Sequence, residues 1–244
     1  MADAVTSVEL KLAERTLELD SAIEELDSFE YSISHDLLAP LRVIEGFSAI
    51  LATDQVGSQS GEGQSYLRAI RDSAERMQEL VDGLLRLSRV RRQPLSKQPC
   101  SPAVLAEQAL TQLGQDPHSN DIEIEVKPMP ECFGDPLLLV DVWANLIGNA
   151  IKFRSPKTVA HIVIGYREQA GYPHYYVSDN GLGLDARHLD RIFRVFQRLQ
   201  HSNDFKGTGV GLAIVSRILQ RHGGAISVES EPGAGSTFLF TIPS

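Results

Sequence analysis

Apolar residues recur every seven positions along the first part of the chain. A second apolar series accompanies this one, although Arg15 interrupts it. A heptad pattern of this kind predicts a coiled-coil seam. Neither proline nor glycine occurs between residues 5 and 39, so we expect one very long first helix. The residues of the seven-residue series are Val5, Leu12, Leu19, Leu26 and Ile33.

A second amphipathic run extends from Leu67 to Leu87, after the polar segment TDQVGSQSGEG. Two long amphipathic helices joined by a short loop predict a helical hairpin. A single hairpin cannot bury both apolar stripes, whereas two hairpins packed as a four-helix bundle can. We therefore expect a homodimer. The second helix ends in a basic cluster of Arg86, Arg89, Arg91 and Arg92. We interpret these residues as cations that interact favourably with the dipole at the C-terminal end of the helix.

Beyond the proline-containing linker QPLSKQP, the pattern changes to mixed α and β. Helices on one face of a largely antiparallel sheet predict an α+β sandwich. The expected helices cover residues 102–113, 136–153 and 209–222, and the expected strands cover 121–127, 161–168, 175–179, 225–230 and 236–242. The expected segments are a coiled-coil helix (1–20), a hairpin (21–93), a linker (94–99) and the sandwich domain (100–244).

The composition restricts the classes of partner. The net charge is −9 over 244 residues, so the chain lacks the basic field that binds nucleic acid. The two cysteines, Cys100 and Cys132, form no C-x-x-C pair and suit a reducing compartment; we interpret them as isolated small apolar residues. The apolar stretches fall short of the ~20 residues of a membrane span, and the start lacks the pattern of a secretory signal. We expect a cytoplasmic protein that contacts no membrane.

Glycines alternate in GTGVGLAI, Gly207–Ile214, where the last helix is expected to begin. Such spacing lets backbone N–H groups approach an anion closely, and the helix dipole favours negative charge there. The segment differs from a dinucleotide fingerprint, because the glycines run G-x-G-x-G and follow a polar stretch. It also differs from a Walker A loop, because Lys206 precedes the first glycine.

Three polar residues share one face of the helix expected at 136–153. Asn145, Asn149 and Lys152 are spaced by four and three positions. An amide oxygen suits Mg²⁺ and a lysine suits phosphate oxygens, although a solvated helix face is the alternative interpretation. Asp179 ends a strand in DNGLG, and its carboxylate offers only acceptors, which match the amino group of adenine.

The order of these motifs resembles that of the sensor histidine kinases of two-component systems. SISHDLLAPL is similar to the H box of that family, NLIGNAIKF to the N box, DNGLG to the G1 box, IFRVFQRL to the F box and GTGVGLAI to the G2 box. Kinases of the bacterial phytochrome type look most similar. The resemblance covers nearly the whole chain and implies a dimerisation and phosphoacceptor hairpin, followed by an ATP-binding domain of the gyrase, Hsp90, kinase and MutL superfamily.

The resemblance implies the roles of individual residues. His35 would accept the γ-phosphoryl group of ATP with Asp36 as its neighbouring acid, and would pass it to an aspartate in the receiver domain of a response regulator. Asn149 would hold Mg²⁺, and Asp179 would select adenine. The implied ATP-binding set is Asn145, Asn149, Lys152, Asp179, Gly181, Gly183, Lys206, Gly207, Thr208, Gly209, Gly211 and Leu212. A mobile lid over about residues 185–206 would contain Phe193, Phe196 and Arg198, with Arg194 and His201 near the phosphates.

The surroundings of His35 fit a phosphoacceptor. His35 follows the seam residue Ile33 by two positions, a rotation of about 200°, so its ring should point away from the dimer core. Pro40 removes the N–H that would bond the Asp36 carbonyl, which weakens this turn; we expect the coiled coil to act on it. Ala39 stands where many relatives carry Thr or Asn, which implies weak phosphatase activity.

Two other classes of function remain as alternatives. A non-catalytic scaffold would bind ATP and signal through the dimer, and an ATPase related to gyrase or to a chaperone would release phosphate. Labelling with γ-labelled ATP separates these classes from a kinase. Residues 1–30 are typical of a signalling helix, which fits either an upstream sensor domain or a stand-alone kinase that takes its signal from a partner.

Overall fold

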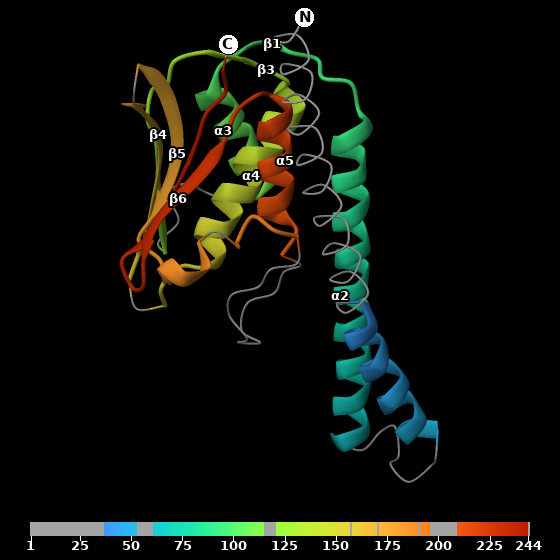
Figure 1. Ribbon diagram of the computed structural model, residues 1–244. Coiled ribbons are helices and arrows are strands. Elements are labelled where there is room, and N and C mark those ends of the chain that lie inside the picture. Colours follow the sequence, from blue (N-terminus) through green and yellow to red (C-terminus); the bar gives the residue numbers. More distant parts are fainter. Residues whose placement is uncertain are drawn as a thin grey trace, which may run out of the picture. The chain divides into compact units, whose positions relative to one another are not determined.

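The computed structural model describes residues 37–52, 61–114, 121–156, 158–169, 171–189, 191–195 and 209–243 (Figure 1). The chain divides into two compact units, with the boundary between Gln78 and Glu79. Within the described residues, no helix combines the length and the hydropathy needed to cross a membrane.

The first unit contains two helical segments. Residues 37–52 form a helix that includes the buried Pro40, and the part of α2 (Gly61–Arg92) up to Gln78 follows. The ring of Phe47 stacks on that of Tyr66 with centroids 4.8 Å apart, which joins the two segments. The predicted hairpin is thus confirmed. The coiled coil predicted before residue 37 and the turn beside Asp36 lie outside the described residues.

Several large apolar side chains of the hairpin are exposed in the single chain. They lie on both helical segments, at exposed fractions of 37–46%. Exposed apolar side chains in this number are typical of a surface that another protein covers. They support the homodimer, which stays a prediction. These residues are Leu38, Leu41, Val43, Ile50 and Leu67.

The last turns of α2 belong to the second unit. Leu80, Leu87 and Val90 are buried there. Arg86 donates to the Asp141 carboxylate at 3.0 Å, in the helix α4 (Pro136–Lys152). Arg86 therefore also forms an ion pair with another element, while Arg89, Arg91 and Arg92 lie in the last turn of α2, where the interpretation as cations at the helix end places them.

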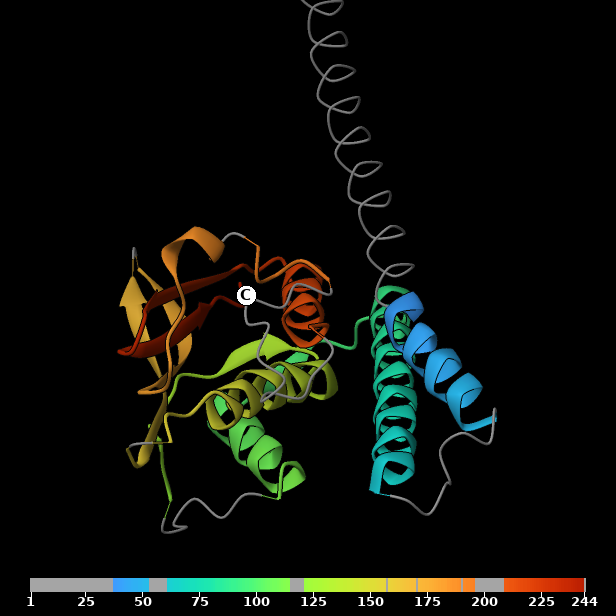
Figure 2. The ribbon, with the colours of Figure 1, turned by 90° about the horizontal axis from the view of Figure 1, so that it is seen from below.

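The second unit is built on a five-stranded sheet with the order β2-β4-β5-β7-β6. β2 and β4 pair in parallel and the other neighbours pair antiparallel. The helices α3, α4 and α5 lie on one side of this sheet (Figures 1 and 2), which confirms the predicted sandwich. The bounds are β2 Ile122–Val126, β4 Ala160–Gln169, β5 Tyr172–Asp179, β6 Ile226–Glu231, β7 Gly235–Phe240, α3 Pro102–Gln112 and α5 Gly211–Arg221.

The core lies between the sheet and the helices. Alternating residues of the strands point inward, which buries Ile162 and Ile164 of β4. Trp143 of α4 packs edge-on against Phe240, with ring centroids 4.9 Å apart. The apolar face of α4 is thereby fixed on the sheet, so its half-buried polar side chains are held in place.

Asp135 determines where α4 begins. Its buried carboxylate accepts hydrogen bonds from the backbone N–H groups of Leu137 and Leu138, and Pro136 occupies the first turn. Such a cap satisfies N–H groups that have no partner within the helix, and a proline is tolerated there because its missing N–H is not needed.

A small two-stranded sheet was not expected. β1 (Gln98–Cys100) pairs antiparallel with β3 (Cys132–Gly134), so a strand begins inside the predicted linker. Three residues are too few to show an alternating pattern, and Pro99 argued against a strand. Cys100 and Cys132 are direct neighbours across this ladder, so their interpretation as isolated residues is wrong.

Candidate nucleotide-binding site

Asn145 of α4 meets the start of α5. Its side-chain amide donates to the Asp141 carbonyl at 2.7 Å, which fixes the direction of the side chain. A Cβ atom added to Gly211 would lie 2.6 Å from Asn145 Oδ1, closer than real Cβ contacts allow. The glycine therefore permits the N-terminus of α5 to approach the polar face of α4. This contact brings together the motifs NLIGNAIKF and GTGVGLAI.

Asp179 ends β5 with one carboxylate oxygen already engaged. Oδ1 accepts from the N–H of Gly181 at 2.8 Å and from the N–H of Ser236 at 3.3 Å. Both donors use the same oxygen, so Oδ2 remains an acceptor for a further donor as far as the described residues show. Burial raises the pKa of Asp179, and the two backbone hydrogen bonds oppose that rise.

The G1 loop, residues 180–184, follows Asp179 and packs tightly. The Leu182 N–H donates to the carbonyl of Phe153 at 3.0 Å, and a Cβ atom on Gly181 would overlap this carbonyl. Gly183 has φ +65°, and a side chain there would overlap the carbonyl oxygen of Glu231. Glycine is needed at both positions because backbone fills the space that a side chain would occupy.

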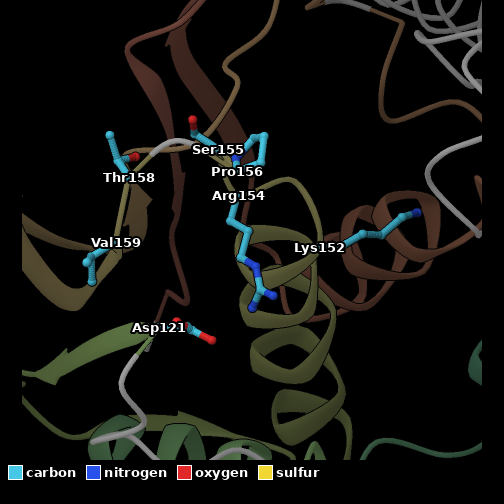
Figure 3. Close-up of a pocket in the computed structure, with 7 residues that line it drawn as sticks. All are labelled: Asp121, Lys152, Arg154, Ser155, Pro156, Thr158 and Val159. Carbon is cyan, nitrogen blue, oxygen red and sulfur yellow. The ribbon is translucent and has the colours of Figure 1, made fainter.

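Asn149 and Lys152 lie on the last turns of α4. Both are half-buried. The Lys152 ammonium lies 4.6 Å from the centroid of the Phe153 ring. Figure 3 shows Lys152 pointing away from the other residues that line a nearby cavity of about 600 Å³, while Arg154 and Asp121 point into it. The seven lining residues are Asp121, Lys152, Arg154, Ser155, Pro156, Thr158 and Val159.

The predicted lid is described only in part. Asp185 begins the short 3₁₀ helix η1 (Ala186–His188), and its carboxylate accepts from the Arg187 N–H and pairs with the Arg187 guanidinium at 2.7 Å. This pairing holds the pKa of Asp185 far below its usual range. Phe193 is half-buried and Arg194 is exposed. The predicted residues that lie outside the described ones are His35, Asp36, Phe196, Arg198, His201, Lys206, Gly207 and Thr208.

The glycine motif before α5 is described from Gly209 onward. Gly209 has φ +71°, a conformation that favours glycine, and Val210 then caps α5. Leu212 in the first turn is half-buried. The start of this eleven-residue helix therefore presents backbone N–H groups beside Asn145, an arrangement that attracts anions.

These residues fit a nucleotide with a magnesium ion. Asp179 Oδ2 matches the adenine amino group, and the glycine backbone and helix terminus match phosphate. Mg²⁺ binds through one or two protein oxygens plus substrate phosphates, so a single asparagine such as Asn149 is sufficient. Among the described residues no cluster of three His, Cys, Asp or Glu side chains forms a metal site of its own.

Two contributors to the site had no signal in the sequence. The Ser236 N–H holds Asp179 from a position 57 residues away, and the carbonyl of Asp141 orients Asn145. The first contact depends on the register that pairs Asp179 with Ser236 across β5 and β7. The hydroxyls of Ser178 and Thr237 form a hydrogen bond of 2.8 Å at the adjacent pair.

Comparison with known families agrees with this fold and site. The family model for histidine kinase-, DNA gyrase B- and HSP90-like ATPases matches residues 134–244. The model for the His Kinase A phospho-acceptor domain matches residues 25–93. The fold and the site therefore define an ATP-binding module that is joined to a phosphoacceptor domain.

Individual relatives point the same way. Cyanobacterial phytochrome B from Nostoc sp. is 37% identical over 235 residues, which are 95% of this chain and 31% of the phytochrome. The structure of full-length ShkA in complex with AMPPNP has 29% identity and a TM-score of 0.58, covering 86% of this chain and 44% of ShkA. The structure of histidine kinase ThkA in complex with the response regulator protein TrrA has 19% identity and a TM-score of 0.67, covering 91% of this chain and 63% of that one, and supports the fold alone.

The chain belongs to the sensor histidine kinases. It carries their phosphoacceptor domain followed by their ATPase domain, which binds ATP, and it spans about a third of the length of the curated relatives that it matches.

Proposed function

We propose that the chain is an ATP-dependent histidine autokinase. It transfers the γ-phosphoryl group of ATP to His35 and passes that group to an aspartate of a response regulator. One observation carries the proposal: two backbone N–H groups hold Asp179 through Oδ1. The loop that follows Asp179 packs so tightly against other backbone atoms that only glycine fits at positions 181 and 183. This arrangement suits recognition of adenine.

The described residues divide the binding of ATP between two ends of the site. Asp179 Oδ2 accepts from the adenine amino group, while Gly181 and Gly183 let the loop after Asp179 pack against the carbonyls of Phe153 and Glu231. At the other end, the N-terminus of α5 faces the phosphates beside Asn145. Phosphoryl transfer depends mainly on positioning and on charge neutralisation, and both ends contribute to positioning.

Asn149 is the residue that would hold Mg²⁺, which neutralises charge on the phosphate oxygens. Lys152 supplies a positive charge on the same helix. In the transfer step, the neutral ring of His35 attacks the γ-phosphorus, the bond from that phosphorus to the bridging oxygen breaks, and ADP leaves. Asp36 accepts a hydrogen bond from the other ring nitrogen, which favours the developing positive charge. The lid residues Phe193, Phe196 and Arg198 would cover the bound nucleotide.

Two similar proteins support the proposed ligand and partner. ShkA is described in complex with AMPPNP, an ATP analogue, and ThkA in complex with a response regulator protein. We infer a receiver domain as the partner of this chain and a homodimer as its working form, consistent with the exposed apolar residues of the hairpin. An upstream sensor domain and a cytoplasmic location stay predictions.

A non-catalytic scaffold that binds ATP is the alternative. Incubation of the whole chain with γ-labelled ATP and Mg²⁺ separates the two. A kinase yields protein-bound label that is stable in base and labile in acid, and the His35→Gln variant yields none. A scaffold yields no label in either protein, and an ATPase releases free phosphate from both. Unlabelled protein that still binds ATP would overturn the proposal.

Ala39 bears on the reverse reaction. It is exposed on the helix of residues 37–52 and its methyl group cannot orient a water molecule. We infer that the protein removes phosphate from its response regulator only slowly. Incubating the phosphorylated regulator with the protein and ADP tests this inference, because rapid loss of phosphate would contradict it.

A further inference from the structure

Cys100 and Cys132 lie opposite one another on the two-stranded sheet. Their Sγ atoms are 3.4 Å apart, and their Cα atoms are partners in the antiparallel register of β1 and β3. Neither cysteine forms a disulfide. Cα atoms of directly opposed antiparallel residues are about 4.5 to 5.5 Å apart, which falls in the range that a disulfide spans. Only a small approach of the sulfur atoms separates the thiol pair from a disulfide.

The two thiols differ in environment. Cys132 is buried, with an exposed fraction of 9%, whereas Cys100 is half-buried. Burial raises the pKa of the Cys132 thiol, and its hydrogen bond with Cys100 raises it further. Because the thiolate is the reactive form, Cys132 is a poor first nucleophile. Cys100 is therefore the thiol that an oxidant in solution reaches first.

We propose that Cys100 and Cys132 form an oxidative modification site that a hydroperoxide converts to an intramolecular disulfide. The thiolate of Cys100 attacks one oxygen of hydrogen peroxide and becomes a sulfenic acid, and the leaving hydroxide takes up a proton to give water. The Cys132 sulfur then attacks Cys100 Sγ, the S–O bond breaks, and the hydroxyl leaves with the Cys132 proton as a second water. Overall, two thiols lose two electrons to one peroxide.

The position of the pair gives the disulfide a structural consequence. β1 follows α2 after a few residues, and β3 ends directly before Asp135, the cap of α4. Asp135 also accepts from the Ser96 N–H at 3.0 Å, just before β1. A disulfide would add a covalent bond beside this hydrogen bond and close a loop over residues 101–131. It would hold the entry of the chain into the sandwich domain against the helix that carries Asn145.

The proposal does not depend on kinase activity, so its test uses chemistry. The whole chain is treated with hydrogen peroxide, its remaining thiols are alkylated, and peptides are mapped by mass spectrometry. We expect a Cys100–Cys132 cross-link within one chain that dithiothreitol reverses. We also expect the oxidised protein to melt about 5 °C or more above the reduced protein, because the cross-link restricts the unfolded chain.

Single variants test the order of reaction. In Cys132→Ala, Cys100 should accumulate as a sulfenic acid that dimedone traps, because its partner is missing. In Cys100→Ser, Cys132 should stay a thiol under the same treatment, because it is buried. Circular dichroism verifies that each variant is folded, and Cys100→Ser also removes the cross-link if Cys132→Ala is unstable. Alkylation of both cysteines after peroxide treatment, a cross-link between two chains, or sulfinic acid on Cys100 of the unmodified protein would overturn the proposal.

Discussion

The side-chain oxygen of Asn145 lies against the backbone of Gly211, with no room for a Cβ atom between them. The contact joins the middle of α4 to the first residue of α5. It explains why two motifs that are far apart in the sequence, NLIGNAIKF and GTGVGLAI, act as one site. Any side chain at position 211 must displace the amide that Asp141 holds.

The first prediction concerns Gly211→Ala. The new methyl group would lie 2.6 Å from Asn145 Oδ1, so the asparagine has to rotate and lose its bond to the Asp141 carbonyl. The lost hydrogen bond costs about 1 kcal/mol of stability. We expect a loss of stability of about that size and at least about tenfold weaker ATP binding by calorimetry, since 1.4 kcal/mol of lost contacts already gives that factor.

Gly148→Ala is the matched control for this prediction. Gly148 lies on α4, the helix of Asn145, but the nearest atom that a Cβ there would meet belongs to Leu113, at an ordinary 3.8 Å. The variant should bind ATP normally and gain about 0.5 to 1 kcal/mol of stability. Equal loss of ATP binding in both variants would show that the Asn145 contact is not the cause.

A second prediction concerns Asp179→Asn. The amide oxygen can still accept from Gly181 and Ser236, so the loop keeps its structure. The other side-chain atom, however, changes from an acceptor to an NH₂ donor and opposes the adenine amino group. Loss of a hydrogen bond to a charged group costs about 1.5 to 3 kcal/mol, so the Kd for ATP should rise roughly tenfold to a hundredfold.

Glu229→Gln provides the comparison. Among the described residues this exposed carboxylate of β6 pairs with the exposed Arg167, and surface pairs of this kind contribute little. The affinity of the Glu229→Gln variant for ATP should equal that of the unmodified protein. If Asp179→Asn also retains full affinity, the assignment of Asp179 to adenine is incorrect.

The third prediction is a dependence of stability on pH that arises from His222. This buried ring accepts the Asp135 N–H on Nε2 at 2.9 Å, and its Nδ1 lies 2.8 Å from the Ile218 carbonyl, so only the neutral tautomer with a proton on Nδ1 satisfies both. Burial lowers the pKa of His222, and the nearby charges of Lys97 and Arg221 act in the same direction, while the hydrogen bond to the Ile218 carbonyl and the charge of Asp135 oppose this shift.

The sign follows from proton uptake by the two states. The unfolded chain binds a proton at the ordinary histidine value of 6.5, whereas the folded protein binds it only at lower pH. The stabilisation is therefore complete above about pH 6.5 and is lost as the pH falls toward the lowered pKa. Urea unfolding between pH 8 and pH 5 should show this slope, with a shallower slope in His222→Gln. Parallel curves for the two proteins would rule His222 out as the source.

The fourth prediction tests the dimer. Leu67 of α2 has an exposed fraction of 46% in the single chain. If a second copy covers the exposed part of Leu67, Leu67→Glu removes about 0.7 to 1.4 kcal/mol of apolar burial from each subunit, so the dissociation constant should rise about tenfold to a hundredfold. Sedimentation equilibrium measures this change. Asp72 lies on the opposite side of the helix, so Asp72→Lys is the control and should leave the dimer intact. A dissociation constant unchanged by Leu67→Glu would count against this interface.

Periodicity predicted the helices and long strands because each of them has a continuous apolar side to bury. The pattern around Trp143 and Ile162 was long enough to distinguish helix from strand. β1 and β3 have three residues each and show no such pattern. Their pairing is visible only in three dimensions, and with it the contact between Cys100 and Cys132.

The candidate site was only partly predictable for a related reason. Asp179 and Asn145 could be proposed from their side-chain chemistry and their positions at the end of a strand and on a helix face. The groups that orient them, the Ser236 N–H and the Asp141 carbonyl, are backbone atoms. Every residue has such atoms, so only the strand register and the helix geometry show which of them serve the site.

Mapping the phosphorylated residue tests the central claim most directly. The protein is incubated with ATP and Mg²⁺, digested at alkaline pH, and analysed by mass spectrometry for the peptide that contains His35. The account predicts phosphate on His35, strongly reduced in Asp179→Asn and unchanged in Glu229→Gln. Consumption of ATP with His35 left unmodified, or phosphate on another residue, would contradict it.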